Sequence, residues 1–132
     1  MILVDSSVWI NLLGKSRKHR LSPERLLEVA TCPPVIQEVL QGIGNDLAYQ
    51  RIQESLLALP CFGNPLDMDL YLTASDLYRL ARKQGITIRS SVDCLIAAIA
   101  LRHSLEVWHS DRDFDSLAKI TGLKTRTGST LD

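Results

Sequence analysis

The chain begins with a short, uninterrupted apolar run that ends at an acidic residue. Residues 2–4 (Ile-Leu-Val) show no polar alternation before Asp5, which is typical of a strand buried on both faces of a sheet. Two serines of the kind that begin helices follow, and apolar residues then recur at helical spacing from Val8 to Leu13. The pattern predicts a strand that turns directly into a helix. Asp5 would lie at the carboxyl end of that strand, where open parallel sheets carry their sites.

A similar arrangement recurs near the other end of the chain. Residues 105–108 predict a short strand, Asp111 follows it, and a helical pattern then continues to Gly122. Residues 29–32 and 123–125 predict further short strands, the latter at a sheet edge. Strands that alternate with helices indicate a three-layer α/β/α sandwich around a central parallel sheet of four to five strands.

Helix-start residues, apolar stripes and terminal glycines predict five helices between these two regions. They would begin near Ser22, Pro34, Asp46, Asp69 and Ser90. The first of them would turn inward Leu26, Leu27 and Ala30. The helix from about 46 to 59 would bury Leu47, Ile52, Leu56 and Leu57. Residues 59–65 contain two prolines and predict an irregular or short extended link.

Composition limits the class of protein. With 132 residues, the chain is expected to form a single domain over residues 1–132. Its apolar runs fall far short of the roughly 20 residues that cross a bilayer, so no membrane anchor is expected. The cysteines, Cys32, Cys61 and Cys94, are odd in number and widely spaced. They are typical of reduced core thiols in a cytoplasmic protein, and a zinc site is not expected.

The charges balance overall, with 15 basic and 15 acidic residues. If five of the acids gather in one pocket, the remaining surface carries 15 basic and 15 − 5 = 10 acidic groups and is modestly cationic. A basic loop follows the first helix and contains Lys15, Arg17, Lys18 and Arg20. The loop is a candidate contact for RNA or an acidic partner, and a merely solvated loop is the alternative.

Four acids occupy positions that such a fold can bring together. Asp5 and Asp111 follow strands, while Glu38 and Asp93 lie near helix starts. Crowded carboxylates repel one another and stay ionised only with bound cations. Oxygen ligands without His or Cys favour Mg²⁺ or Mn²⁺, which suits phosphoryl transfer. The alternative is local: Asp5 as a helix cap, and Asp93 as an acid favoured by a helix dipole.

Four segments, in order, resemble the four motifs of PIN-domain ribonucleases and most closely those of VapC toxins. They are residues 2–10, 34–40, 91–98 and 109–115. The resemblance implies Mg²⁺- or Mn²⁺-dependent endonucleolytic cleavage of structured RNA such as tRNA or rRNA. It also implies a homodimer and inhibition by a small VapB-like antitoxin. The implied catalytic acids are Asp5, Glu38, Asp93 and Asp111; Asp5, Asp93 and Asp111 would bind metal with Asp113 in or near the coordination shell, and Ser6 or Ser7 would orient the carboxylates.

Some residues depart from the family pattern or have an open role. Gln37 precedes Glu38 where threonine or serine is common. His109 is expected to pack or hydrogen-bond rather than act as a base, and Asp115 is expected at the surface, where Arg112 is its candidate partner. Core packing is favoured over base stacking for the aromatic side chains Trp9, Trp108 and Phe114.

Other functional classes also stay open. A haloacid-dehalogenase-type phosphatase also begins with a strand-end aspartate, but it needs a second aspartate where this chain has Ser7. A receiver-type signalling domain needs a late lysine, for which Lys119 and Lys124 are poorly placed. A catalytically inactive PIN-like module that only binds RNA or protein is the non-enzymatic alternative.

Overall fold

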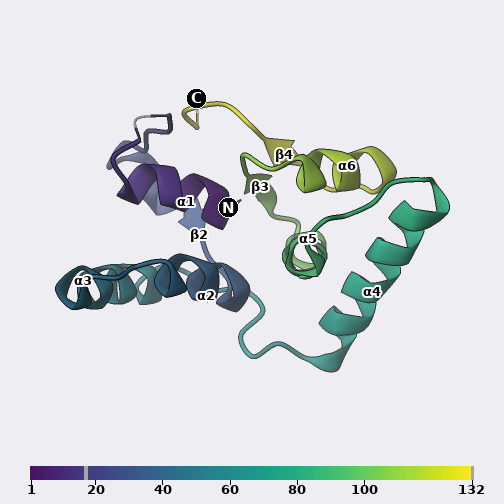
Figure 1. Ribbon diagram of the computed structural model, residues 1–132, viewed down its shortest axis with the longest axis horizontal. Coiled ribbons are helices and arrows are strands. Elements are labelled where there is room, and N and C mark those ends of the chain that lie inside the picture. Colours follow the sequence, from purple (N-terminus) through teal and green to yellow (C-terminus); the bar gives the residue numbers. More distant parts are fainter. Residues whose placement is uncertain (17, 132) are drawn as a thin grey trace.

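A parallel sheet of short strands lies at the centre of the protein, whose computed structural model describes residues 1–16 and 18–131 (Figure 1). The strands β1 (Ile2–Val4), β2 (Val29–Ala30), β3 (Glu106–Trp108) and β4 (Thr125–Arg126) form the order β2-β1-β3-β4. Ile2 pairs with Val29 on one side and with Glu106 on the other. The predicted edge strand near residue 125 is therefore confirmed, and so is the parallel sheet.

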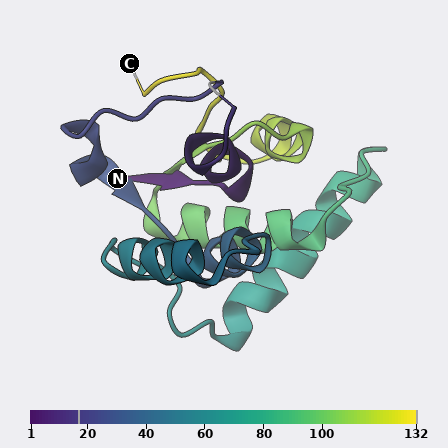
Figure 2. The ribbon, with the colours of Figure 1, turned by 60° about the vertical axis from the view of Figure 1, so that its left-hand side comes forward.

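Helices cover both faces of this sheet, which confirms the predicted α/β/α sandwich. They are α1 (Ser6–Leu13), α2 (Pro33–Gln41), α3 (Asp46–Leu57), α4 (Met68–Lys83), α5 (Ser91–His103) and α6 (Arg112–Ile120). Figure 2 shows α1 and α6 above the purple strand β1, with α2, α3 and α5 below it. Among the described residues, no helix is both long enough and apolar enough to cross a bilayer.

The central strand β1 is apolar because both of its faces are covered. Leu3 and Val4 are fully buried, and each residue of β1 pairs with a neighbouring strand. The predicted core aromatics are also confirmed, since Trp9, Trp108 and Phe114 are all buried. Cys32 and Cys94 are buried free thiols, and Cys61 is half-buried and also free.

The prediction of a helix that begins at Ser22 is wrong, both in the length of the helix and in the side chains that it would bury. Only a short 3₁₀ turn, η1 (Arg25–Glu28), forms there, because Val29 and Ala30 pair with β1 as strand β2. Leu26 and Leu27, which were expected inside, are 44% and 86% exposed. The pairing of β2 with the sheet outweighs the local helical pattern, as tertiary contacts commonly do.

The predicted buried face of α3 is only partly right. Leu56 is buried and Ile52 is packed against the core, but Leu47 and Leu57 are 59% and 65% exposed. Helix α3 packs chiefly against α2, and Leu47 and Leu57 lie on parts of its surface that the described residues leave exposed. Four apolar positions had suggested a wider buried stripe than one neighbour can provide.

The link between α3 and α4 is irregular with one short extended point at Cys61, which agrees with the predicted irregular or short extended link. Thr31 donates its backbone N–H to the Pro60 carbonyl and accepts from the N–H of Phe62, which forms an isolated bridge between Thr31 and Cys61. The link therefore runs alongside the end of β2, at the edge of the sheet. It leads into α4, which packs against α5.

Candidate active site

Asp5 lies at the point where β1 becomes α1, and its two carboxylate oxygens have different surroundings. Its Oδ2 accepts hydrogen bonds from the Ser7 N–H at 3.1 Å and from Ser7 Oγ at 2.5 Å, so it is the N-cap of α1. Its Oδ1 is buried without a hydrogen-bond partner among the described residues. Capping explains one carboxylate oxygen and leaves the other available for a ligand.

Ser7 also ties the two strand ends together. Its hydroxyl accepts a hydrogen bond from the Ser110 N–H at 3.0 Å, while the Asp5 N–H donates to the Trp108 carbonyl. The carboxyl ends of β1 and β3 are therefore held side by side. This places Asp5 and Asp111 at the same edge of the sheet, as adjacent parallel strands predict.

Glu38 reaches this edge from α2. The Ser6 hydroxyl donates to Glu38 Oε1 at 3.1 Å, and Glu38 is close enough to Asp5 and Asp111 to feel their charges. Partial burial is the main cause that raises the pKa of Glu38, the Ser6 hydrogen bond opposes it, and the two aspartates add to it. The two serines thus orient two different acids, Ser6 for Glu38 and Ser7 for Asp5.

Asp93 approaches from the first turn of α5 and is 5% exposed. Burial, together with a hydrogen bond to Asp113 and the charges of the neighbouring aspartates, raises its pKa to about 9. Its Oδ2 has no hydrogen-bond partner in the described part of the chain. A helix dipole alone does not account for an acid that is buried and incompletely bonded.

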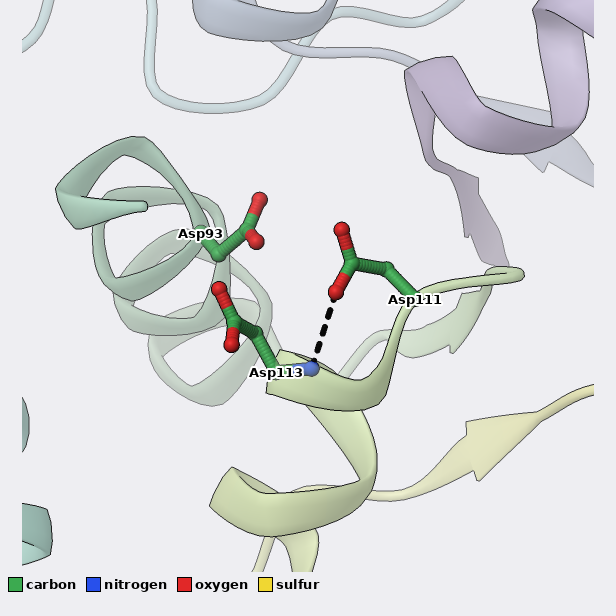
Figure 3. Close-up of side chains that lie close together, drawn as sticks. All are labelled: Asp93, Asp111 and Asp113. Carbon is green, nitrogen blue, oxygen red and sulfur yellow. Dashed lines mark hydrogen bonds between the residues drawn. The ribbon is translucent and has the colours of Figure 1, made fainter. Parts of the chain in front are cut away.

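Asp111 and Asp113 complete the group from the start of α6 (Figure 3). Asp111 is the N-cap of α6, and its Oδ1 accepts from the Asp113 N–H at 2.9 Å. Ligand oxygens of Asp93, Asp111 and Asp113 all lie within 4.8 Å of one another. Asp5 and Glu38 lie outside this closest group but next to it.

These residues fit a hard divalent cation. Asp5 and Asp93 each have a buried carboxylate oxygen that lacks a partner, and an unpaired buried polar atom is costly. Every member of the cluster offers oxygen, the ligand that Mg²⁺ and Mn²⁺ prefer. A cation bound among Asp5, Asp93 and Asp111 would satisfy those atoms and offset the repulsion that, after burial and the Asp113 hydrogen bond, adds to the raised pKa of Asp93.

Arg89 is a site residue that the sequence did not predict. Its guanidinium lies 3.7 Å from Asp111 Oδ1 and 3.9 Å from Asp113 Oδ1, and its backbone N–H donates to Asp113. No motif marked it, because its contacts join the segment before α5 to a helix more than 20 residues later. It supplies one positive charge beside several carboxylates.

His109 is buried and hydrogen-bonded, as its expected structural role requires. Its Nδ1 accepts from the Asp111 N–H at 3.1 Å, so the neutral ring carries its proton on Nε2. Nε2 faces Asp115 Oδ1 at 3.6 Å. Within the described residues, Asp115 therefore lies beside the neutral ring of His109, and no ion pair joins it to Arg112.

The basic loop is only partly a free cationic surface. Lys15, Lys18 and Arg20 are exposed, whereas Arg17, also a candidate contact, lies outside the described residues. His19 between them is buried, with its ring 5.6 Å from that of Trp108 and its Nδ1 3.0 Å from Asn11 Nδ2. The contacts of His19 hold the loop against the protein, while the side chains of Lys15 and Lys18 remain exposed to solvent.

Comparison with known proteins agrees with this arrangement. Residues 2–120 match the PIN domain family. Ribonuclease VapC11 of Mycobacterium tuberculosis is 36% identical over 130 residues, which cover 94% of this chain and 96% of VapC11.

Two solved structures share the fold at lower identity. The M. tuberculosis toxin–antitoxin complex VapBC-5 has a TM-score of 0.67 at 22% identity, over 93% of this chain and 94% of that one. M. tuberculosis VapC20, described as a toxin that cleaves the sarcin-ricin loop, has a TM-score of 0.61 at 21% identity, over 94% and 99%. From the family match and the VapC11 identity, this chain belongs to the PIN-domain family and, within it, to the VapC ribonucleases.

Proposed function

We propose that this protein is the toxin of a VapBC-type toxin–antitoxin pair and acts as a Mg²⁺- or Mn²⁺-dependent endoribonuclease. The observation that supports this most directly is the cluster of Asp93, Asp111 and Asp113, whose ligand oxygens lie within 4.8 Å of one another. Asp5 and Asp93 add buried oxygens without partners. Membership in the VapC ribonucleases supports RNA as the substrate.

The chain's own residues have distinct parts in this proposal. Asp5, Asp93 and Asp111 would hold the cation, with Glu38 beside them, and Ser6 and Ser7 would fix the carboxylates. Asp113 accepts from the N–H groups of Arg89 and Ser90 and so would support the site by positioning the start of α5. A divalent cation supplies Lewis-acid activation of water and neutralises charge on the phosphate.

The proposed substrate is structured RNA in the cytoplasm, either tRNA or rRNA. VapC20, which shares the fold, is described as cleaving the sarcin-ricin loop. The exposed Lys15, Lys18 and Arg20 would contact phosphates near the site. Such contacts fix the position of an RNA without reading its bases.

The proposed partner is a VapB-like antitoxin, and the proposed state of the toxin is a homodimer. An apolar groove of about 550 Å³ is lined by Trp9, Leu13, Leu26 and Leu27 with parts of α3, and Leu27 is 86% exposed. Contiguous exposed apolar surface of this kind marks protein interaction sites. An apolar segment of the antitoxin docked there would account for the leucines that the fold itself leaves uncovered.

An RNA-cleavage assay tests the enzymatic proposal. The purified protein should cut structured RNA with Mg²⁺ or Mn²⁺ and stop when a chelator is added. Loss of a metal ligand costs several kcal/mol of transition-state stabilisation, so Asp5→Asn and Asp93→Asn should each slow cleavage by at least about 100-fold. Asp76→Asn, an exposed acid on α4, is the matched control and should cleave at the parent rate.

The same preparation separates the alternatives. Cleavage by Asp5→Asn at the parent rate, or cleavage that persists in chelator, would contradict the proposal. A phosphorylated Asp5, trapped from a phosphate-ester substrate, would point to the haloacid-dehalogenase-type phosphatase. Absence of Mn²⁺ binding by calorimetry would point to the inactive RNA- or protein-binding module.

A further inference from the structure

A cavity of about 240 Å³ lies beside the acidic cluster, between α2, α5 and the start of α4. Figure 1 shows α5 between α2 and α4. Polar groups on its wall come from Gln37, Glu38 and Gln41 of α2, and apolar groups come from Pro34, Val92 and Tyr71. Its size is below the range for drug-sized ligands and suits a small planar group.

Both main walls of the cavity are continuous with the acidic cluster. Glu38 lines the cavity and also accepts the Ser6 hydrogen bond at the carboxyl end of β1. On the opposite wall, Val92 directly precedes Asp93 on α5. A group held in the cavity is therefore separated from the cluster by about one side chain.

The chemistry of the wall selects a flat, uncharged ligand with donors and acceptors. Gln37 and Gln41 are one helical turn apart and both exposed, and neither amide has a hydrogen-bond partner among residues 1–16 and 18–131. An amide offers donors and an acceptor together, which matches the edge of a nucleobase. Tyr71, 48% exposed, offers a ring for stacking. A phosphate would meet Glu38 and no cationic side chain on this wall.

We propose that this cavity binds one unpaired base of the RNA next to the cleaved bond, with Tyr71 stacking on the base and Gln37 and Gln41 reading its edge. The inference rests on the proposed ribonuclease function and makes it more specific. A base that enters the cavity has to leave its helical stack, so the cut would fall in a loop or bulge. Gln37, the departure from the family pattern, then becomes a specificity residue of this chain.

Cleavage of a random-sequence RNA pool, with sequencing of the new ends, tests the proposal. The parent should prefer one base at a fixed position next to the cut. Gln37→Ala and Gln41→Ala should weaken that preference, and Tyr71→Ala should lower kcat/KM about tenfold through loss of stacking. Tyr71→Phe keeps the ring and should retain the parent rate. Leu72→Ala and Gln50→Ala, both exposed outside the cavity, are matched controls and should behave as the parent.

The outcomes separate the base-binding cavity from the enzymatic proposal. If the parent cleaves RNA, and Gln37→Ala, Gln41→Ala and Tyr71→Ala show the same base preference and rate as the parent, the cavity proposal alone is overturned. A parent that cleaves no RNA overturns both. If sedimentation shows that Tyr71→Ala breaks a dimer of the parent, the cavity is a subunit contact and base binding is overturned. Because Gln37 and Gln41 are exposed, their variants keep the test valid even if Tyr71→Ala folds poorly.

Discussion

Asp93 is the residue on which burial and charge act most strongly. Its pKa is raised to about 9, first by burial and then by its hydrogen bond to Asp113 and the charges of Asp5, Asp111 and Asp113. Without a cation, the folded protein therefore favours a protonated Asp93 at neutral pH. A bound cation would reverse this preference, because metal binding requires the deprotonated carboxylate.

Stability of the metal-free protein should consequently fall at alkaline pH. The folded-state pKa of Asp93 lies above its ordinary value of 3.8, so its contribution to stability is complete below about pH 4 and is lost as pH rises toward 9. Thermal unfolding in chelator should show a lower Tm at pH 9 than at pH 7. The window from pH 7 to 9 avoids His19 and His109, whose lowered pKa values cost stability only as pH falls below about 6.5.

Two comparisons assign the effect to Asp93. Asp93→Asn should remove most of the decline in Tm between pH 7 and 9, because the amide cannot ionise. A small decline near pH 9 should remain, since burial raises the pKa of the Cys32 and Cys94 thiols to about 12 and about 11. Added Mn²⁺ should raise the Tm of the parent most at pH 9 and leave that of Asp93→Asn nearly unchanged. A parent Tm that stays constant or rises across this window in chelator would contradict the raised pKa.

Helix α5 depends on a distant element for its first turn. Its N-cap residue Ser90 makes no side-chain capping bond. Instead, the Asp113 carboxylate of α6 accepts from the Arg89 N–H at 3.1 Å and the Ser90 N–H at 3.0 Å. Asp113 is 3% exposed, so it caps α5 from the side at the place where Asp93 emerges.

Loss of this cap should destabilise the protein and disturb the site together. Asp113→Ala leaves two partly buried N–H groups without acceptors, at a cost of about 2 kcal/mol in the free energy of unfolding. Urea unfolding measures this cost. Asp113→Asn keeps one acceptor oxygen and should lose less, while Asp76→Ala on the exposed side of α4 should lose almost nothing. Equal stability of Asp113→Ala and the parent would show that the cap is dispensable.

The elements that the sequence predicted well are those whose signals are local. Strand β1 is a short continuous apolar run that ends at an acid, and the helices from Pro33, Asp46, Met68 and Ser91 have periodic apolar stripes with clear ends. The segment at 22–28 and the outer leucines of α3 were mispredicted, because what decides them is the strand β2 and a missing neighbour. Neither is visible in a pattern of residues.

The features of the site that the sequence predicted are likewise those with local signals. Strand-end positions predicted Asp5 and Asp111, and helix-start positions predicted Glu38 and Asp93, which the family motifs then supported. Which oxygen atoms lack a partner and which acid is protonated depend on burial. Arg89 and the capping role of Asp113 were missed, because they join segments that are far apart in the sequence. Sequence could therefore predict that these acids approach one edge of the sheet, but not how each carboxylate is held there.

At the scale of the whole molecule, the last described residues fasten the segment that follows α1. Leu131 is buried, and its carbonyl accepts from the guanidinium groups of Arg25, at 2.6 Å, and Arg126. The Arg20 N–H donates to the Ser129 carbonyl, and Trp108 Nε1 donates to that of Gly128 at 2.8 Å. The tail therefore bridges β3, β4 and the 20–28 segment.

Removal of residues 127–132 should loosen that segment and leave the sheet largely intact. Hydrogen exchange should become faster in residues 20–28, which lose Ser129 and Leu131 as partners, but not in α4 or α5. Arg25→Ala should reproduce part of the effect through loss of its Leu131 bond. Arg51→Ala, an exposed arginine on α3, should have none. An unchanged rate of hydrogen exchange in residues 20–28 after truncation would show that this segment does not depend on residues 127–132 for its stability.

The order of the strands has a consequence for the time at which activity can appear. Strand β3 lies between β1 and β4 in the sheet, yet it is translated about 100 residues after β1, and Asp111 and Asp113 emerge later still. A nascent chain on the ribosome carries Asp5, Glu38 and Asp93 without the partners that complete their cluster. A chain that ends before Asp111 therefore could not assemble the metal site, and the proposed cleavage could begin only after nearly the whole chain has been made.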